Sequence, residues 1–84
     1  MQYLPQRSNE LEIEDTGTDV LVHDKRNEKI HILNRTAGAV LLACDGKTAV
    51  QALALQLFPE HPNQAEADIA KVIADFGKLG LLNA

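Results

Sequence analysis

The hydrophobic pattern of this chain changes its period once, near Leu33, and that change is the strongest constraint on the fold. Before it, apolar and polar residues alternate, as in Leu11-Glu12-Ile13-Glu14 and Lys29-Ile30-His31-Ile32-Leu33, which is typical of half-buried strands. After it, from Ala37 to Cys44, apolar residues recur three and four positions apart, which is typical of a helix. We therefore expect every strand to precede every helix.

Two polar turns divide the first part of the chain into three strands. Asp15-Thr16-Gly17-Thr18 and Lys25-Arg26-Asn27-Glu28 both carry turn residues. Short strands joined by tight turns form an antiparallel meander. The expected strands cover residues 11–14, 19–23 and 29–33.

Capping residues divide the second part into three helices. Asn34, Thr48 and Asn63 are expected N-caps, and Glu66 stands three residues after Asn63 as in a capping box. Glycine is the usual left-handed residue after a helix. The first helix is therefore expected to end at Asp45-Gly46, the second near Phe58, and the third at Leu79, before Gly80.

The order of three strands and three helices predicts an α+β fold, a three-stranded antiparallel meander followed by a three-helix bundle. Winged helix-turn-helix proteins share this layout. With 84 residues and no long linker, residues 1–84 are expected to form a single domain. Residues 1–10 precede the first strand and are expected to be an N-terminal extension, whose flexibility the sequence leaves open.

Charge and cysteine content narrow the class of protein. The formal net charge of −4 argues against non-specific binding to nucleic acid or to an anionic membrane, because phosphates attract Lys and Arg. The single cysteine excludes an internal disulfide, and the N-terminus has no apolar signal core. The longest apolar stretch is far too short to span a bilayer. We therefore expect a cytoplasmic protein.

Gly46-Lys47-Thr48 matches the end of a phosphate-binding loop. Such a loop needs another glycine five positions before Gly46, between a strand and a helix. That position is Leu41, on the apolar face of an expected helix. We therefore interpret Asp45-Gly46 as a helix stop and Thr48 as an N-cap.

No other residues form a catalytic or metal-binding pattern. Metal sites need closely spaced ligands, and His23, His31, His61 and Cys44 show no such spacing. Cys44 is expected to be a small buried hydrophobe. We expect no enzyme activity, no metal and no cofactor.

Two features suggest a peptide site. In a meander the third strand is an edge, and residues 29–33 contain no proline or glycine to block the addition of another strand. On the third helix, small residues line one flank between the apolar and the charged faces: Ala67, Ala70, Ala74 and Gly77. This flank either packs closely against a neighbouring element or borders a shallow groove for an extended peptide.

The chain resembles the PqqD-like family. The resemblance rests on Leu33-Asn34-Arg35-Thr36-Ala37, on Asp45 to Thr48, and on a last helix that opens on Asp68-Ile69 and closes on Phe76-Gly77-Lys78-Leu79-Gly80-Leu81-Leu82. Members are recognition elements for ribosomally made, post-translationally modified peptides, with a winged helix-turn-helix-like fold that binds no DNA.

The resemblance implies a non-catalytic function. The leader segment of a precursor peptide would add as an antiparallel strand to the third strand and lie beside the third helix. The domain would present this peptide to a modifying enzyme, such as a radical S-adenosylmethionine enzyme, a cyclase or a leader peptidase. The implied peptide-binding residues are Lys29, Ile30, His31, Ile32 and Leu33 on the strand and Ala67, Ala70, Lys71, Ala74 and Lys78 on the helix.

Two other functions remain open at this point. The fold layout permits a winged-helix DNA-binding protein, although residues 48–58 carry no charge with which to contact phosphates. The same edge and groove would also suit an adaptor subunit that binds another protein and no leader peptide.

Overall fold

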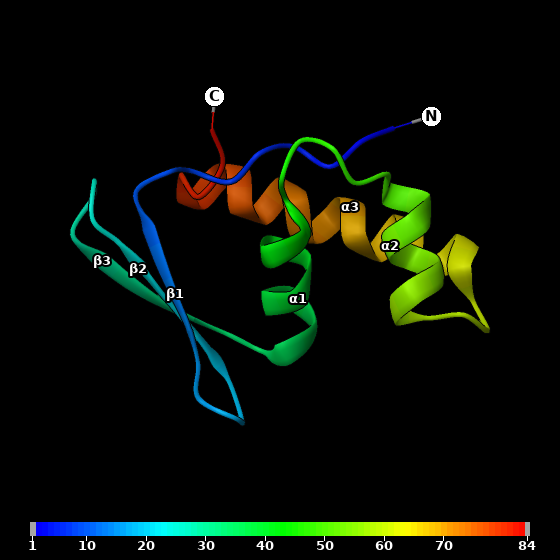
Figure 1. Ribbon diagram of the computed structural model, residues 1–84, viewed down its shortest axis with the longest axis horizontal. Coiled ribbons are helices and arrows are strands. Elements are labelled where there is room, and N and C mark those ends of the chain that lie inside the picture. The colour runs from blue at the N-terminus through cyan, green and yellow to red at the C-terminus, as the bar shows by residue number, and fades with distance from the viewer. Residues whose placement is uncertain (1, 84) are drawn as a thin grey trace.

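The computed structural model describes residues 2–83 and contains three strands followed by three helices (Figure 1). The expected α+β order is confirmed, and each strand boundary lies within one residue of its expected position. The elements are β1 (Leu11–Asp15), β2 (Val20–Asp24), β3 (Lys29–Leu33), α1 (Arg35–Ala43), α2 (Val50–Leu57) and α3 (Pro62–Leu79).

The strands form an antiparallel sheet in the order β1-β2-β3, and the helices lie on one side of it (Figure 1). On β2, Val20, Val22 and Asp24 are buried and form the inner face with the residues that pair with them. Because side chains alternate along a strand, Ile30 and Ile32 lie on the opposite, outer face.

Helix α1 begins where the sequence predicts and packs closely on the sheet. The Asn34 side chain accepts a hydrogen bond of 2.7 Å from the Ala37 backbone N–H, which confirms Asn34 as the N-cap. Gly38 is buried, and a Cβ at this position would overlap the Val20 side chain. Helix and sheet are therefore as close here as a glycine allows.

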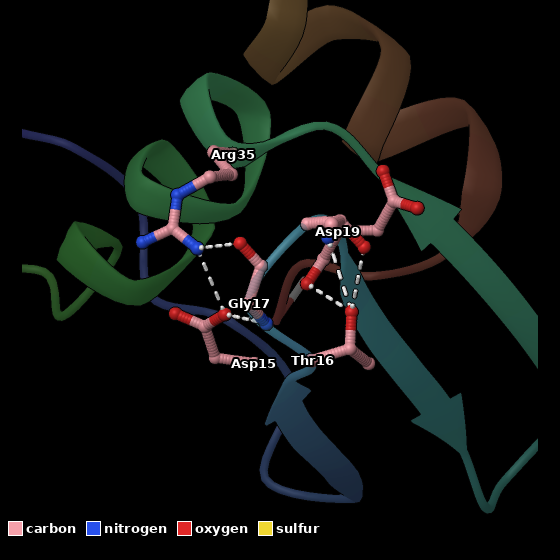
Figure 2. A network of polar contacts seen from close by, with 6 residues as sticks. Asp15, Thr16, Gly17, Asp19 and Arg35 are labelled. Atoms are coloured by element: carbon pink, nitrogen blue, oxygen red, sulfur yellow. Dashed lines mark hydrogen bonds and ion pairs between the residues drawn. The ribbon is translucent and has the colours of Figure 1, made fainter.

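A polar network joins the β1–β2 turn to the start of α1 (Figure 2). Arg35 Nη1 donates to Asp15 Oδ1 at 3.1 Å and to the Gly17 carbonyl at 2.9 Å. Asp15 Oδ1 also accepts from the Gly17 N–H at 2.8 Å. The network holds the far end of the first hairpin beside the helix.

The segment after α1 differs from the expectation. The helix ends at Ala43, before Asp45-Gly46, and Ala49 rather than Thr48 is the N-cap of α2. Asp45 explains both differences, because its Oδ1 accepts from the N–H groups of Lys47 and Thr48, both at 2.8 Å, and its Oδ2 accepts from the Thr48 hydroxyl. The N–H groups that would hold a phosphate are thus already bonded within the turn.

Helix α3 starts earlier than expected and ends where expected. Pro62 occupies the first turn and His61 the N-cap, so Asn63 lies inside the helix and the proposed capping box is wrong. Gly80 ends the helix in the left-handed conformation, with φ of 77°. Ile69 and Phe76 are buried and Val72 and Ile73 are partly buried, so these four residues form the face of α3 that packs on the core.

Residues 2–8 are packed into the domain rather than extending from it. Leu4 is only 1% exposed, and its N–H donates to the Thr48 carbonyl at 2.7 Å. The Arg7 N–H donates to the Cys44 carbonyl, and the Ser8 N–H to the Leu81 carbonyl. The segment thus ties the end of α1 to the C-terminus. None of the helices in residues 2–83 has the length and apolar character needed to cross a bilayer.

Candidate functional site

β3 is one of the two edges of the sheet. Within residues 2–83, β3 pairs only with β2, so the backbone groups along its other side have no strand partner. β1 is the opposite edge, but it carries Glu12 and Glu14, and Glu12 forms an ion pair with Lys25. Charged side chains discourage strand addition. β3 is therefore the more suitable template for a further strand.

The outer face of β3 is apolar and uncovered. Ile30 is 67% exposed and Ile32 is 69% exposed, and the partly buried Leu21 of β2 pairs with Ile32. We call these three residues the outer apolar patch. Next to it, a hollow of about 400 Å³ reaches Ile30, His23 and Glu12. Exposed β-branched side chains on a free edge are unusual, because edges tend to aggregate unless protected.

The inner face of β3 is partly covered. Lys29 is exposed, while His31 and Leu33 are partly buried. The Nε2 atom of His31 is buried and finds no hydrogen-bond partner among residues 2–83. Buried polar atoms are almost always hydrogen-bonded. A bound molecule could supply the hydrogen-bond partner that His31 Nε2 lacks.

The turn before β3 is held by Asp24. Its carboxylate accepts from the Asn27 side chain at 2.7 Å and from the N–H groups of Asn27 and Arg26. These bonds, the Asn27 side chain foremost, lower the pKa of Asp24 below its ordinary value, and His31 adds to the effect. The carboxylate is therefore charged at neutral pH and fixes the start of β3.

The residues of α3 that were expected to bind the peptide lie on more than one face of the helix. Ala67, Ala70, Lys71, Ala74 and Lys78 are all exposed, so close packing does not explain the small residues. At about 100° per residue, Ala67 lies opposite the buried Phe76 and points away from the core. Ala70 borders a hollow of about 250 Å³ with Tyr3 and Pro5. Its flank of α3 thus faces the N-terminal segment.

The other flank of α3 was not singled out from the sequence. Asp75 and Leu79 lie about 60° to 100° from Phe76, on the side away from Ala70. Leu79 is 43% exposed although it is apolar. Immediately after it, a Cβ on Gly80 would lie 3.4 Å from Asn27 Nδ2. The end of α3 therefore lies beside the turn that leads into β3. In the sequence, the only sign of this flank was a leucine directly before the glycine that ends the helix.

The remaining candidate groups do not form a reactive site. Residues 2–83 contain no cluster of three or more His, Cys, Asp or Glu side chains suited to a metal ion. Cys44 is fully buried, as expected, and its Sγ contacts the Val40 carbonyl at 3.1 Å. Burial raises the pKa of the Cys44 thiol to about 11, so it is protonated at neutral pH and a poor nucleophile.

Comparison with known proteins gives one match. The family model described as coenzyme PQQ synthesis protein D (PqqD) matches residues 10–82, nearly the whole chain. Neither the curated proteins nor the solved structures gave a match.

Proposed function

The chain belongs to the PqqD family, and from this membership we propose that it binds the leader segment of a ribosomally synthesised precursor peptide without catalysing a reaction on it. The family's description connects it with the synthesis of a cofactor. For this chain we propose the same kind of role, in which a peptide is bound and handed to the enzyme that modifies it.

The observation that carries this proposal is the free β3 edge. An extended peptide adds to such an edge through backbone hydrogen bonds, while alternate side chains give specificity. Lys29 to Leu33 contains no proline or glycine, and Ile30 and Ile32 are exposed beside the edge. A leader strand would cover both isoleucines on the outer face.

On the inner face the peptide would lie between β3 and α3. Side chains alternate along the added strand, so every second one would point toward His31 and the helix. A hydrogen-bonding side chain placed opposite His31 would satisfy the buried Nε2 atom. We therefore expect the leader to carry a polar residue between two apolar ones.

We assign the helical wall of this site to the flank of Asp75 and Leu79. That flank leads to the β2–β3 turn, whereas Ala70 borders the N-terminal segment. Lys71 and Lys78 have side chains long enough to reach a peptide from the neighbouring face. Under this assignment Ala67 and Ala74 point to solvent.

Binding without chemistry still promotes modification. Holding the leader beside a modifying enzyme makes the encounter of the core peptide with that enzyme intramolecular and raises its effective concentration. A radical S-adenosylmethionine enzyme, a cyclase or a leader peptidase would suit this arrangement. DNA binding has less support, because α2 carries no charged residue with which to contact phosphates.

The first experiment is recovery of the tagged protein from its native host, with mass spectrometry of both the protein and the small-peptide fractions. We expect a short precursor peptide. Hydrogen exchange with that peptide should then slow at residues 29–33 and stay unchanged in β1, the other edge of the same sheet. A larger protein or DNA recovered without a peptide, or protection confined to β1, would contradict the proposal.

A further inference from the structure

The exposed side of α2 is apolar and uncharged, and from this surface we infer where the modifying enzyme docks. The end of α2 binds a segment of that enzyme in which Lys or Arg residues flank apolar ones. The identity of the partner as the modifying enzyme rests on the proposed function. The chemistry of the segment follows from the surface itself.

The side of α2 that faces away from the core lacks the usual polar character. A surface helix normally carries charged or polar residues on that side. The buried residues of α2 are Leu53 and Ala54, and the helix contains no charged residue. At about 100° per residue, Leu55 points almost opposite to Leu53. It is nevertheless apolar, and it is 48% exposed.

Three exposed apolar residues follow one another along this side. Ala52, Leu55 and Phe58 are spaced by three positions, so they lie on successive turns in one row. Phe58, which directly follows the helix, is 40% exposed. We call these three residues the α2 stripe. A single exposed apolar residue is common on protein surfaces, whereas a continuous patch indicates an interaction site.

Phe58 stands between two hollows. One, of about 260 Å³, is lined by Leu57, Phe58 and Pro59, with Glu60 and His61 at the turn. The other, of about 240 Å³, lies between Phe58 and the start of α3. Protein interfaces are commonly centred on apolar side chains that fill such pockets. Apolar side chains of a partner would therefore contact the Phe58 ring from both sides.

The charges around the α2 stripe are acidic. Residues 48–70 contain three acidic residues and neither Lys nor Arg. Glu60 borders the first hollow and Asp68 the second. Neither carboxylate forms an ion pair within residues 2–83. A partner with Lys or Arg beside its apolar residues is complementary to this surface. Nucleic acids and anionic lipids present phosphates, which the same surface repels.

The α2 stripe is remote from the proposed leader site. Helix α2 packs against α3 and α1, and it lies at the end of the molecule away from the sheet (Figure 1). An enzyme docked on α2 would therefore leave the β3 edge free. Presentation requires that the leader and the enzyme be held at the same time, so that modification becomes intramolecular. Two separate surfaces allow this.

Photo-cross-linking in the native host tests the surface. The photoreactive residue p-benzoylphenylalanine replaces Phe58 in one variant and, as a control, Thr18, which is exposed in the β1–β2 turn. We expect position 58 to cross-link to an enzyme that acts on the precursor peptide, through a segment with Lys or Arg beside apolar residues. No cross-link at position 58, equal yields at both positions, or a cross-link to lipid, nucleic acid or an acidic segment would overturn the inference.

Two substitutions of Leu55 then separate apolar contact from charge. Leu55→Lys and Leu55→Glu both remove the apolar side chain from an exposed position, but only the lysine repels a basic partner. With the purified cross-linked enzyme, Leu55→Lys should weaken binding by about tenfold or more, and Leu55→Glu by less. Circular dichroism would confirm that both variants are folded.

Leader binding provides the independent readout. Calorimetry with the peptide recovered from the host should give the same dissociation constant for both Leu55 variants and the wild type. Equal enzyme binding by the Lys and Glu variants would overturn the inference. Peptide protection of residues 29–33 without any effect at positions 55 and 58 would do so while leaving the proposed function intact.

Discussion

Gly38 of α1 lies directly against the side chain of Val20 on β2. Gly38→Ala would place a methyl group inside the Val20 side chain, which is itself buried. Although alanine favours helix, overpacking should dominate and lower the free energy of unfolding by about 1–3 kcal/mol. Denaturant unfolding measures this.

Gly77 of α3 is the matched control. It is exposed, and a Cβ there would meet nothing within 4 Å among the described residues. Gly77→Ala should therefore raise the free energy of unfolding by about 0.5–1 kcal/mol, because alanine loses less backbone entropy in a helix. Equal effects at the two glycines would contradict the close contact at Gly38.

Leu4→Ala tests whether the N-terminal segment is part of the core. Leu4 is 1% exposed and belongs to the hydrophobic core. The substitution should lower the free energy of unfolding by about 2–5 kcal/mol, because it leaves a cavity. Tyr3→Ala, next to it but 59% exposed, should change stability by about 0.5 kcal/mol or less. Similar small effects at both positions would mean that the segment is loosely held.

The lowered pKa of Asp24 predicts that the folded chain loses stability in acid. Its pKa is lower in the folded chain than in the unfolded chain, so its contribution to stability is present above its ordinary pKa and is lost as the pH falls through the folded value. Asn27→Ala removes the main cause of the lowering, so the variant should be less stable than the wild type at neutral pH and should lose less stability as the pH falls into acid. Thermal melting between neutral pH and acid would show this, and coincident acid profiles of the two proteins would argue against it.

The raised pKa of Cys44 predicts that the folded chain loses stability in base. Its pKa is raised to about 11 by burial, so the stability that the protonated thiol contributes is present below the ordinary thiol pKa of about 8.5 and is lost as the pH rises toward the folded value. A thiol reagent at mildly alkaline pH should react slowly with the folded chain and rapidly in urea. Fast reaction without denaturant would show that Cys44 is accessible.

The two flanks of α3 predict different effects on peptide binding. With the peptide recovered from the host, Leu79→Ala should weaken binding by about tenfold, because an exposed leucine beside the groove loses its contact. Ala67→Ser, on the face opposite the core, should leave the dissociation constant unchanged. The reverse result, measured by calorimetry, would return the site to the face of the alanines.

Much of the local structure was predictable because it depends on neighbouring residues. The alternation in Lys29 to Leu33 identifies a strand, and the Asn34 side chain reaches only as far as the N–H of Ala37. Gly80 ends α3 because few other residues adopt its left-handed conformation. Such interactions span a few residues and can be inferred from spacing alone.

The expected N-caps of α2 and α3 were wrong because neighbouring residues compete for the start of each helix. Thr48 and Asn63 are both good N-caps, but Asp45 bonds to Thr48, and Pro62 starts α3 one residue before Asn63. Proline costs nothing at the first turn of a helix, where its missing N–H has no partner to lose. Spacing alone does not indicate which of two adjacent caps is used.

By itself, the sequence determined the order of the elements, the family and the fact that Ile30 and His31 point to opposite sides of β3. Only the tertiary structure decided which of these sides the helices cover. That outcome depends on contacts between residues far apart in the chain. Gly38 lets α1 pack closely on Val20, and Leu4 packs into the core from the N-terminal segment. Burial depends on such distant contacts, whereas alternation depends only on the backbone. The same contacts leave Ile30 and Ile32 exposed beside the free edge.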